Sequence, residues 1–253
     1  MYVLELHCKG SLVSVTDENR RHELQSILTS LIDCFFEANT SLNLFNNELE
    51  NKHKKISFDA LEIKSSWEER RDRLIEIEKE IQVKYDTCDY DSHGRMLYEA
   101  NVILKKEEWS REIPPRQMNH NRIFIFAKSF LYSLDTIREI LRVISENENA
   151  SSERVEIFKS MDASLPELRE VRNSAHHLED RIRGIGKHKK KISLQSSGLV
   201  LNNLVGTKYG CTMADGDYGE VDVSSETLEI VQKIVQRALD SFEWIGEPNH
   251  FPT

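Results

Sequence analysis

One short segment, residues 171–181 (VRNSAHHLEDR), concentrates the side chains that could do chemistry. Within six consecutive positions it holds an arginine, an amide and two histidines: Arg172, Asn173, His176 and His177. Arginine binds a phosphate through a planar fork of N–H donors, and histidine gives or takes a proton near neutral pH. Together these side chains are enough to cleave RNA without a metal ion.

The charge pattern adds a basic patch to an otherwise acidic chain. The chain of 253 residues has a net charge of −9, which argues against nucleic-acid binding over its whole surface because phosphate contact needs clustered Lys and Arg. Residues 169–191 are the exception: eight basic residues stand against three acidic ones, which leaves +5 there and −14 on the rest. This footprint predicts RNA-backbone contacts by Arg169, Arg181, Arg183, Lys187, Lys189, Lys190 and Lys191. A solvated linker is the alternative interpretation of residues 187–191.

Composition excludes several classes of protein. At 39% hydrophobic and 30% charged residues the chain has the make-up of a soluble globular protein. It has no run of about 18 apolar residues that would span a membrane, and its first 15 residues carry charges where a signal peptide needs an apolar core. We therefore expect a cytoplasmic protein.

The cysteines and the short motifs argue against a bound metal or cofactor. Cys8, Cys34, Cys88 and Cys211 lie far apart, without Cys-x-x-Cys spacing, which disfavours a zinc ribbon and a disulfide framework. No Walker loop, Gly-x-Gly-x-x-Gly or His-Glu-x-x-His motif occurs. We expect reduced thiols, no metal and no cofactor.

Apolar residues spaced by three and four predict a mainly helical chain. The expected helices cover residues 18–51, 65 or 66 to 85, 96–109, 122–144, 152–160, 165–183 and 226–244. Ser65 or Ser66 is expected to open the second of these with a capping box, and Asn121 to cap the fourth. The sixth contains residues 171–181, which we call the Arg–His segment. Its start is predicted from a capping box formed by Ser164 and Glu167, and its end from Gly184.

Alternating residues predict a few strands, at 2–6, 199–201, 209–213 and 218–223. Asp215-Gly216 is expected to form the hairpin turn between the last two. The expected fold is mainly α: an antiparallel helical bundle with a small C-terminal β-hairpin and a final helix. Its segments are a short N-terminal strand or lead-in (1–17), the bundle (18–184), and a basic linker with the hairpin and the C-terminal helix (185–253).

An ideal helix over residues 165–183 would bury one apolar stripe, formed by Leu168, Val171, Ala175, Leu178 and Ile182. On such a helix Arg172 and His177 are about 140° apart, whereas His176 lies one turn above Arg172. A single ideal helix therefore does not bring Arg172 and His177 onto one phosphate.

The segment resembles the Arg-x4–6-His signature of the HEPN superfamily (higher eukaryotes and prokaryotes nucleotide-binding helical domains), in which a polar residue usually follows the arginine, as Asn173 follows Arg172. The resemblance implies a HEPN-like bundle over residues 18–184. It also implies a metal-independent endoribonuclease that cuts single-stranded RNA through a 2′,3′-cyclic phosphate, as a homodimer whose two motifs line one cleft. Bacterial defence or stress response is the role that the family implies, with an antitoxin or another defence-system protein as a further partner.

The resemblance assigns roles residue by residue. Arg172 would stabilise charge on the phosphoryl oxygens, His177 would act as general base or acid, and Asn173 would position the phosphate or orient the histidine. His176 and Glu179 are accessory candidates. Many family members carry a tyrosine where this chain has Glu179, so regulation by nucleotide transfer to that tyrosine is not expected here. The alternative is a catalytically inactive HEPN-like module that binds RNA, a nucleotide or a protein.

Overall fold

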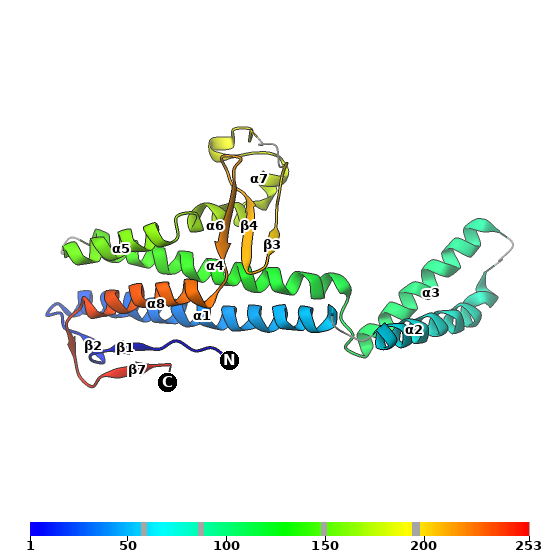
Figure 1. Cartoon of the computed structure of the whole chain (residues 1–253), viewed down its shortest axis with the longest axis horizontal. Helices are drawn as coiled ribbons and strands as arrows, with labels where there is room; N and C mark the ends of the chain where they lie inside the picture. The colour runs from blue at the N-terminus through cyan, green and yellow to red at the C-terminus, as the bar shows by residue number, and fades with distance from the viewer. Residues whose placement is uncertain (57–59, 86–88, 148–150, 194–197, 253) are drawn as a thin grey trace. The chain divides into compact units, whose positions relative to one another are not determined.

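The computed structural model describes residues 1–56, 60–85, 89–147, 151–193 and 198–252. These residues form a mainly helical protein with a few small antiparallel sheets, as expected (Figure 1). The chain divides into two compact units, one made of Met1–Asn47 and Ile123–Thr253, the other of Glu48–Arg122. The second unit is thus inserted in sequence within the first, a division that differs from the three expected segments 1–17, 18–184 and 185–253.

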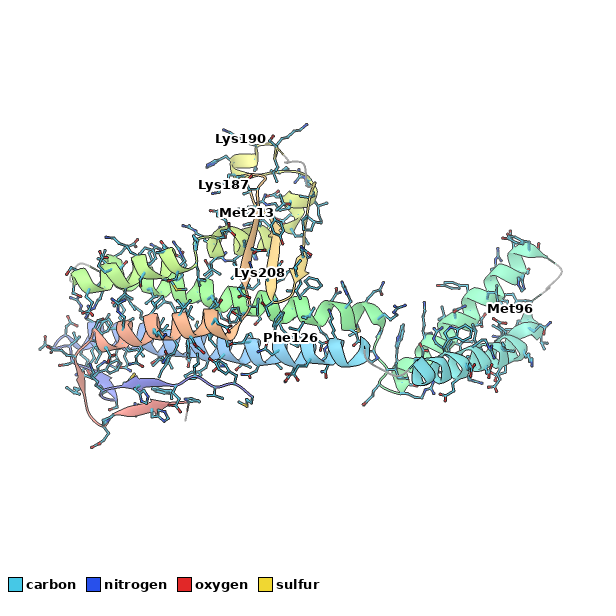
Figure 2. The ribbon with its side chains drawn as sticks, in the orientation of Figure 1. Met96, Phe126, Lys187, Lys190, Lys208 and Met213 are labelled. Carbon is cyan, nitrogen blue, oxygen red and sulfur yellow. The ribbon has the colours of Figure 1, made fainter. Side chains whose placement is uncertain are left out.

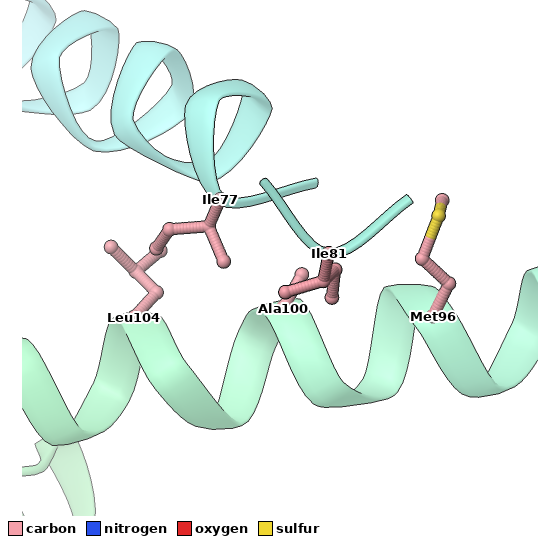
Figure 3. Packing of buried hydrophobic residues seen from close by; sticks show 5 residues of the cluster. All are labelled: Ile77, Ile81, Met96, Ala100 and Leu104. Carbon is pink, nitrogen blue, oxygen red and sulfur yellow. The ribbon is translucent and has the colours of Figure 1, made fainter. Parts of the chain in front are cut away.

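The inserted unit contains a helical hairpin. Its helices are α2 (Ala60–Ile81) and α3 (Tyr90–Ser110), with a 3-10 turn, η1 (Gln82–Lys84), after α2. Their facing sides bury a small apolar cluster (Figure 3), formed by Ile77, Ile81, Met96, Ala100 and Leu104. This cluster holds the hairpin together because it is where the apolar faces of both helices meet.

Two predicted helix starts in this unit are wrong. α2 already begins at Ala60, so Ser65 and Ser66 lie inside it and do not open a capping box. α3 begins at Tyr90, six residues earlier than expected, because the Asp89 carboxylate accepts a hydrogen bond from the Ser92 N–H at 3.0 Å and so caps the helix. Cys88 lies outside the described residues.

The first unit is built on long helices. α1 (Glu18–Ile56) and α4 (Arg116–Glu146) are joined by a hydrogen bond between the hydroxyls of Ser41 and Ser129 at 2.9 Å, and α5 (Ser152–Ser164) packs against α8 (Ser225–Asp240). The core between them contains fully buried aromatic and aliphatic side chains, among them Phe35, Phe45, Phe130 and Leu131. None of the helices in the described ranges is long and apolar enough to cross a membrane.

The start of α4 and the end of α8 also differ from the expectation. α4 starts at Arg116, directly after Pro115, so Asn121 lies inside the helix and does not cap it. Proline favours the position just before or at a helix start because it has no N–H to leave unpaired. α8 ends at Asp240, four residues before the predicted end.

Two short strand pairs bring the ends of the described chain together. β1 (Leu6–Cys8) pairs with β7 (Asn249–Phe251), and β2 (Leu12–Val13) pairs with β6 (Trp244–Ile245), both antiparallel. The strand predicted at 2–6 therefore begins only at Leu6.

The residues before β1 are bound to α1 instead of joining a sheet. The backbone N–H of Leu4 donates to the Asn39 amide oxygen at 3.0 Å, and the N–H of Tyr2 donates to that of Asn43 at 2.6 Å. These side-chain bonds satisfy backbone groups that a longer strand would have paired.

A three-stranded antiparallel sheet follows the Arg–His segment. It has the order β3 (Asn203–Val205), β4 (Lys208–Thr212), β5 (Tyr218–Asp222). The predicted turn at Asp215-Gly216 is confirmed, and Gly216 has the positive φ of +100° that such a turn needs. Residues 199–201 are not a strand, so this prediction is wrong.

Candidate functional site

The Arg–His segment forms two helices rather than one. α6 (Leu168–His176) and α7 (Leu178–Ile182) are separated by His177, whose backbone angles (φ −94°, ψ 51°) are not helical. α6 ends with the bond from the His177 N–H to the carbonyl of Asn173 at 2.9 Å, and the His177 carbonyl accepts from the Arg181 N–H of α7 at 3.2 Å. The predicted single helix over 165–183 is therefore wrong, and the break falls at the proposed proton-transfer residue.

The start of α6 also differs from the expectation. Ser164 ends α5, and Glu167 precedes α6 without a capping bond from its side chain, so the predicted capping box is wrong. The Glu167 carboxylate instead accepts a hydrogen bond from the backbone N–H of Glu220 in β5 at 2.8 Å. This bond, with the packing of β4 and β5 on α6, fixes α6 against the sheet.

The break changes which side chains are buried. Leu168, Val171 and Ala175 are buried as predicted, but Leu178 is only half-buried and the exposed fraction of Ile182 is 59%. The predicted apolar stripe is therefore right for α6 and wrong for α7, because the non-helical angles of His177 rotate α7 relative to α6.

In α7 the buried side chain is that of Arg181, in place of the predicted Leu178 and Ile182. Its exposed fraction is 6%, and its guanidinium donates to the hydroxyl of Ser174 at 3.2 Å and to the carbonyl of Ile185. A buried charge needs such partners to offset its desolvation. Arg181 therefore stabilises the segment internally, and its assignment as an RNA contact is corrected.

Arg172 is held in a fixed orientation by two partners. Its Nε donates to Asp135 Oδ2 at 2.7 Å, its Nη2 donates to the same oxygen, and its Nη1 donates to Asn173 Oδ1 at 2.9 Å. A guanidinium carries five N–H donors, so these three bonds leave two for another ligand. The side chain of Arg172 is 29% exposed, so it lies at the edge of the core.

Asp135 and Tyr132 belong to this site and were not predicted from the sequence. Both come from α4, and the Asp135 side chain is 2% exposed, with Oδ1 buried and without a hydrogen-bond partner among the described residues. Burial raises the pKa of Tyr132, and the nearby charge of Arg172 opposes this rise. The sequence signal for Asp135 was an acid among the apolar residues of the helix predicted at 122–144, where burial demands a cationic partner.

The two histidines form a connected row with Tyr132. The ring of His176 meets that of Tyr132 edge-on, with centroids 6.3 Å apart, and meets that of His177 edge-on at 5.1 Å. His177 is 51% exposed, so it is not packed in the core of its own bundle. The structure thus places His176 against Tyr132, whose pKa also responds to the charge of Arg172, and it places His177 beside His176 at the surface.

Glu179 lies beside His177. Its Oε1 is 3.6 Å from His177 Nδ1. The pKa of Glu179 is lowered, first by the bond from its own backbone N–H and then by His177 and His176. An ionised carboxylate at this place can orient the imidazole and stabilise its protonated form.

The same corner contains a set of metal-ligating atoms. One ligand atom each from His177, Glu179 and Asp180 lies within 4.8 Å of the others. The sequence led us to expect no metal here, and the donor set is one that a divalent transition metal accepts. If RNA is cleaved here, cleavage in the presence of a chelator would distinguish a metal-independent site from one that needs a metal.

The basic run is a hydrogen-bonded loop at the end of α7. Gly184, with φ +66°, ends α7 as predicted: its N–H donates to the Arg181 carbonyl at 2.9 Å, and the Ile185 N–H to that of Asp180 at 2.8 Å. The loop closes where the Ile192 N–H donates to the Gly184 carbonyl at 2.8 Å. The backbone of the loop is therefore ordered by its own hydrogen bonds.

The lysines of this loop point into solvent. All four, Lys187, Lys189, Lys190 and Lys191, are exposed, and Figure 2 shows Lys187 and Lys190 on the outer part of the yellow loop. Lys187 also pairs with Glu170 of α6 at 2.9 Å.

Arg169 and Arg183 are exposed as well. Six of the seven predicted RNA-contacting residues are thus at the surface, with Arg181 as the exception.

Neither a protein-family model, nor a curated protein, nor a solved structure matches this chain.

Proposed function

We propose that this protein is a metal-independent endoribonuclease of the HEPN kind, which cleaves single-stranded RNA and acts as a homodimer. The observation that supports this most is the helix break at His177, which exposes its imidazole next to His176. Arg172, on the same short segment, is held in one orientation by its hydrogen bonds to Asp135 and Asn173, and it keeps two N–H donors for a phosphate. An acid–base group and an oriented phosphate donor are the two components that the reaction needs.

In the proposed reaction the 2′-hydroxyl of RNA attacks the adjacent phosphorus. The new bond joins the 2′-oxygen to phosphorus, and the bond from phosphorus to the 5′-oxygen breaks, which leaves a 2′,3′-cyclic phosphate. His177 takes the proton from the 2′-hydroxyl or gives one to the departing 5′-oxygen. A second copy of the chain would supply the other proton transfer, and Arg172 would stabilise the charge on the phosphoryl oxygens.

The neighbours of these residues have supporting roles. Glu179, within 3.6 Å of His177 Nδ1, would leave Nε2 directed at the substrate and stabilise the imidazolium. Asn173 bonds Arg172 and would therefore act on the phosphate through the orientation of that arginine. His176 would shape the surface between Arg172 and His177.

The exposed lysine loop would bind the RNA backbone. Lys189, Lys190 and Lys191 have no sequence-reading geometry of their own, and clustered ammonium groups attract phosphates without regard to sequence. Binding should therefore weaken steeply with salt, while cleavage depends on the Arg–His segment.

A non-catalytic RNA-, nucleotide- or protein-binding module is the second candidate. It is favoured by one observation, the engagement of Arg172 with the buried carboxylate of Asp135, since an arginine with this structural role needs no substrate. The two candidates differ in what they do to RNA.

Incubation of the full chain with labelled single-stranded RNA and EDTA tests the proposal. We expect cleavage that EDTA does not prevent and products that end in a 2′,3′-cyclic phosphate. A shift of intact RNA without cleavage would support the binding module. Cleavage abolished by EDTA would contradict the metal-independent mechanism and point to the set of His177, Glu179 and Asp180.

A further inference from the structure

Three metal-ligating side chains lie together on the sheet formed by β1 and β7, in a part of the chain that the proposed ribonuclease does not use. They are Glu5, His7 and His250, and one ligand atom from each lies within 4.8 Å of the others. His250 Nε2 is 3.4 Å from Glu5 Oε2. The rings of His7 and His250 are stacked, with centroids 4.7 Å apart and planes 21° apart.

The strand pairing explains why the three side chains meet. His7 and His250 are directly opposite each other in the antiparallel register of β1 and β7. Glu5 is two residues before His7, and residues two apart on an extended chain face the same side. On the other side of β1, Leu6 and Cys8 are buried, so the alternation fixes the ligands on the outer face.

Two glutamines of α8 hold the backbone that carries these ligands. The side-chain amide of Gln236 accepts from the N–H of His7 and donates to its carbonyl, both at 2.9 Å. Gln232, one turn earlier, donates to the carbonyl of Glu5 at 2.9 Å. The backbone of Glu5 and His7 is therefore positioned independently of any bound ion, which reduces the cost of ordering the site.

The local charges allow a cation to approach. Lys9 is two residues after His7 and on the same face of the strand, but its ammonium is paired with Asp240 at 3.0 Å. Glu5 contributes a negative charge to the site, and His7 and His250 contribute neutral donors when they are unprotonated. All three ligands are exposed, so an ion can reach them from solvent.

We propose that Glu5, His7 and His250 form a binding site for a transition-metal dication of the zinc class, which ties β1 to β7. Two imidazoles and one carboxylate are a ligand set that zinc accepts, and a tetrahedral ion at about 2.05 Å from each donor needs donors about 3.4 Å apart. The distance between His250 and Glu5 already meets this value, and rotation of the His7 side chain closes the rest. Water completes the coordination.

The expected consequence is a metal-dependent gain in stability of the strand pair. β1 and β7 pair over only three residues each, and a two-stranded sheet of this size has little stability of its own. A ligand that binds the folded state alone stabilises it according to its concentration relative to Kd. At about 100 times Kd, a rise in Tm of roughly 5 °C or more is expected for a chain of this length.

Calorimetric titration of the chelator-treated full chain with ZnCl2, followed by thermal unfolding with and without the metal, tests the proposal. We expect micromolar binding and a rise in Tm. His7→Ala and His250→Ala should each weaken this binding at least about tenfold, since even an outer-shell partner is typically worth 10–100-fold. Glu5→Gln tests the carboxylate with the smallest change in shape.

Two histidine variants serve as matched controls. His22→Ala removes an exposed imidazole that also lies near a glutamate, Glu18, and His177→Ala removes the other metal-ligating set. Both should retain the site. Any of three results would overturn the proposal. Zinc binding could survive both His7→Ala and His250→Ala, it could be lost in His177→Ala, or it could be absent at millimolar zinc. Far-ultraviolet circular dichroism of each metal-free variant verifies its fold, and Glu5→Gln decides the matter if a histidine variant unfolds.

Discussion

Arg172 of α6 forms an ion pair with Asp135 of α4, and the side chain of Asp135 is 2% exposed while that of Arg172 is 29% exposed. The pair joins the Arg–His segment to α4. Because both Nε and Nη2 donate to one oxygen of Asp135, the arginine neutralises a buried charge. If Arg172 also binds the phosphate, as proposed, a change at this residue should affect stability and activity together.

Arg172→Ala should destabilise the protein by about 3–5 kcal/mol, the usual consequence of leaving one member of a buried ion pair without its partner. Urea unfolding followed by circular dichroism measures this. Loss of activity in this variant alone is therefore weak evidence for catalysis.

A second substitution separates the two effects of Arg172. Asp135→Asn in the Arg172→Ala background removes the unpaired charge and should restore most of the lost stability, without restoring cleavage of RNA. If the double variant is no more stable than Arg172→Ala, the buried carboxylate is not the cause of the loss. If it cleaves RNA, Arg172 has no catalytic role.

Gly186→Ala should displace the lysine loop. A methyl group at this position would lie 2.2 Å from the carbonyl oxygen of Ala214, so the backbone must shift. We expect weaker RNA binding, with the slope of log K against log salt reduced by about 1–2 as phosphate contacts are lost. A filter-binding series at several salt concentrations measures this slope.

The matched control for this substitution is Gly94→Ala, because a methyl group at that position meets no atom within 4 Å. It should leave RNA affinity and its salt slope unchanged. An unchanged slope in Gly186→Ala, with the fold intact, would show that the position of the loop does not matter for RNA binding.

Two buried thiols should make stability fall at high pH. Burial raises the pKa of Cys211 to about 11, although the positive charges of Arg181 and Lys128 oppose this rise. Burial, together with the smaller effect of the negative charge of Asp240, raises the pKa of Cys8 to about 11. The unfolded chain loses these protons near pH 9, whereas the folded chain retains them. The resulting stability is fully present below about pH 9 and is lost as pH rises through about 11.

The double variant Cys8→Ala, Cys211→Ala tests this dependence. Its free energy of unfolding should be lower than that of the natural chain at pH 8, because two buried side chains are truncated, but it should fall less between about pH 9 and 11. Equal slopes for the two proteins would mean that other groups, such as buried tyrosines, control stability in this range.

The sequence predicted the helices well where long amphipathic patterns decide the structure. α1, α4 and α8 lie where the spacing of apolar residues placed them, and their ends moved because capping depends on one side chain. Asp89 caps α3 and Pro115 precedes α4, whereas the proposed caps at Ser65 and Asn121 lie inside helices. Periodicity extends over many residues, and a cap does not.

The site was less predictable because it depends on long-range contacts. The break at His177 turns Arg181 inward to Ser174. No spacing of residues in the sequence predicts this break, since each residue of the segment is compatible with a helix. Asp135 is 37 residues from Arg172 in sequence. The pairing of β1 with β7 joins residues more than 240 positions apart and escapes any local pattern.

The rate of RNA cleavage by His177→Ala tests the central claim most directly, because this side chain is exposed and its removal should leave the fold intact. With labelled single-stranded RNA in EDTA, we predict a rate about 10²–10⁴-fold below that of the natural chain, an unchanged Tm and nearly unchanged RNA affinity. His22→Ala, the same change at a distant exposed histidine, should cleave at the natural rate. A folded His177→Ala protein that cleaves RNA as fast as the natural chain would contradict the account.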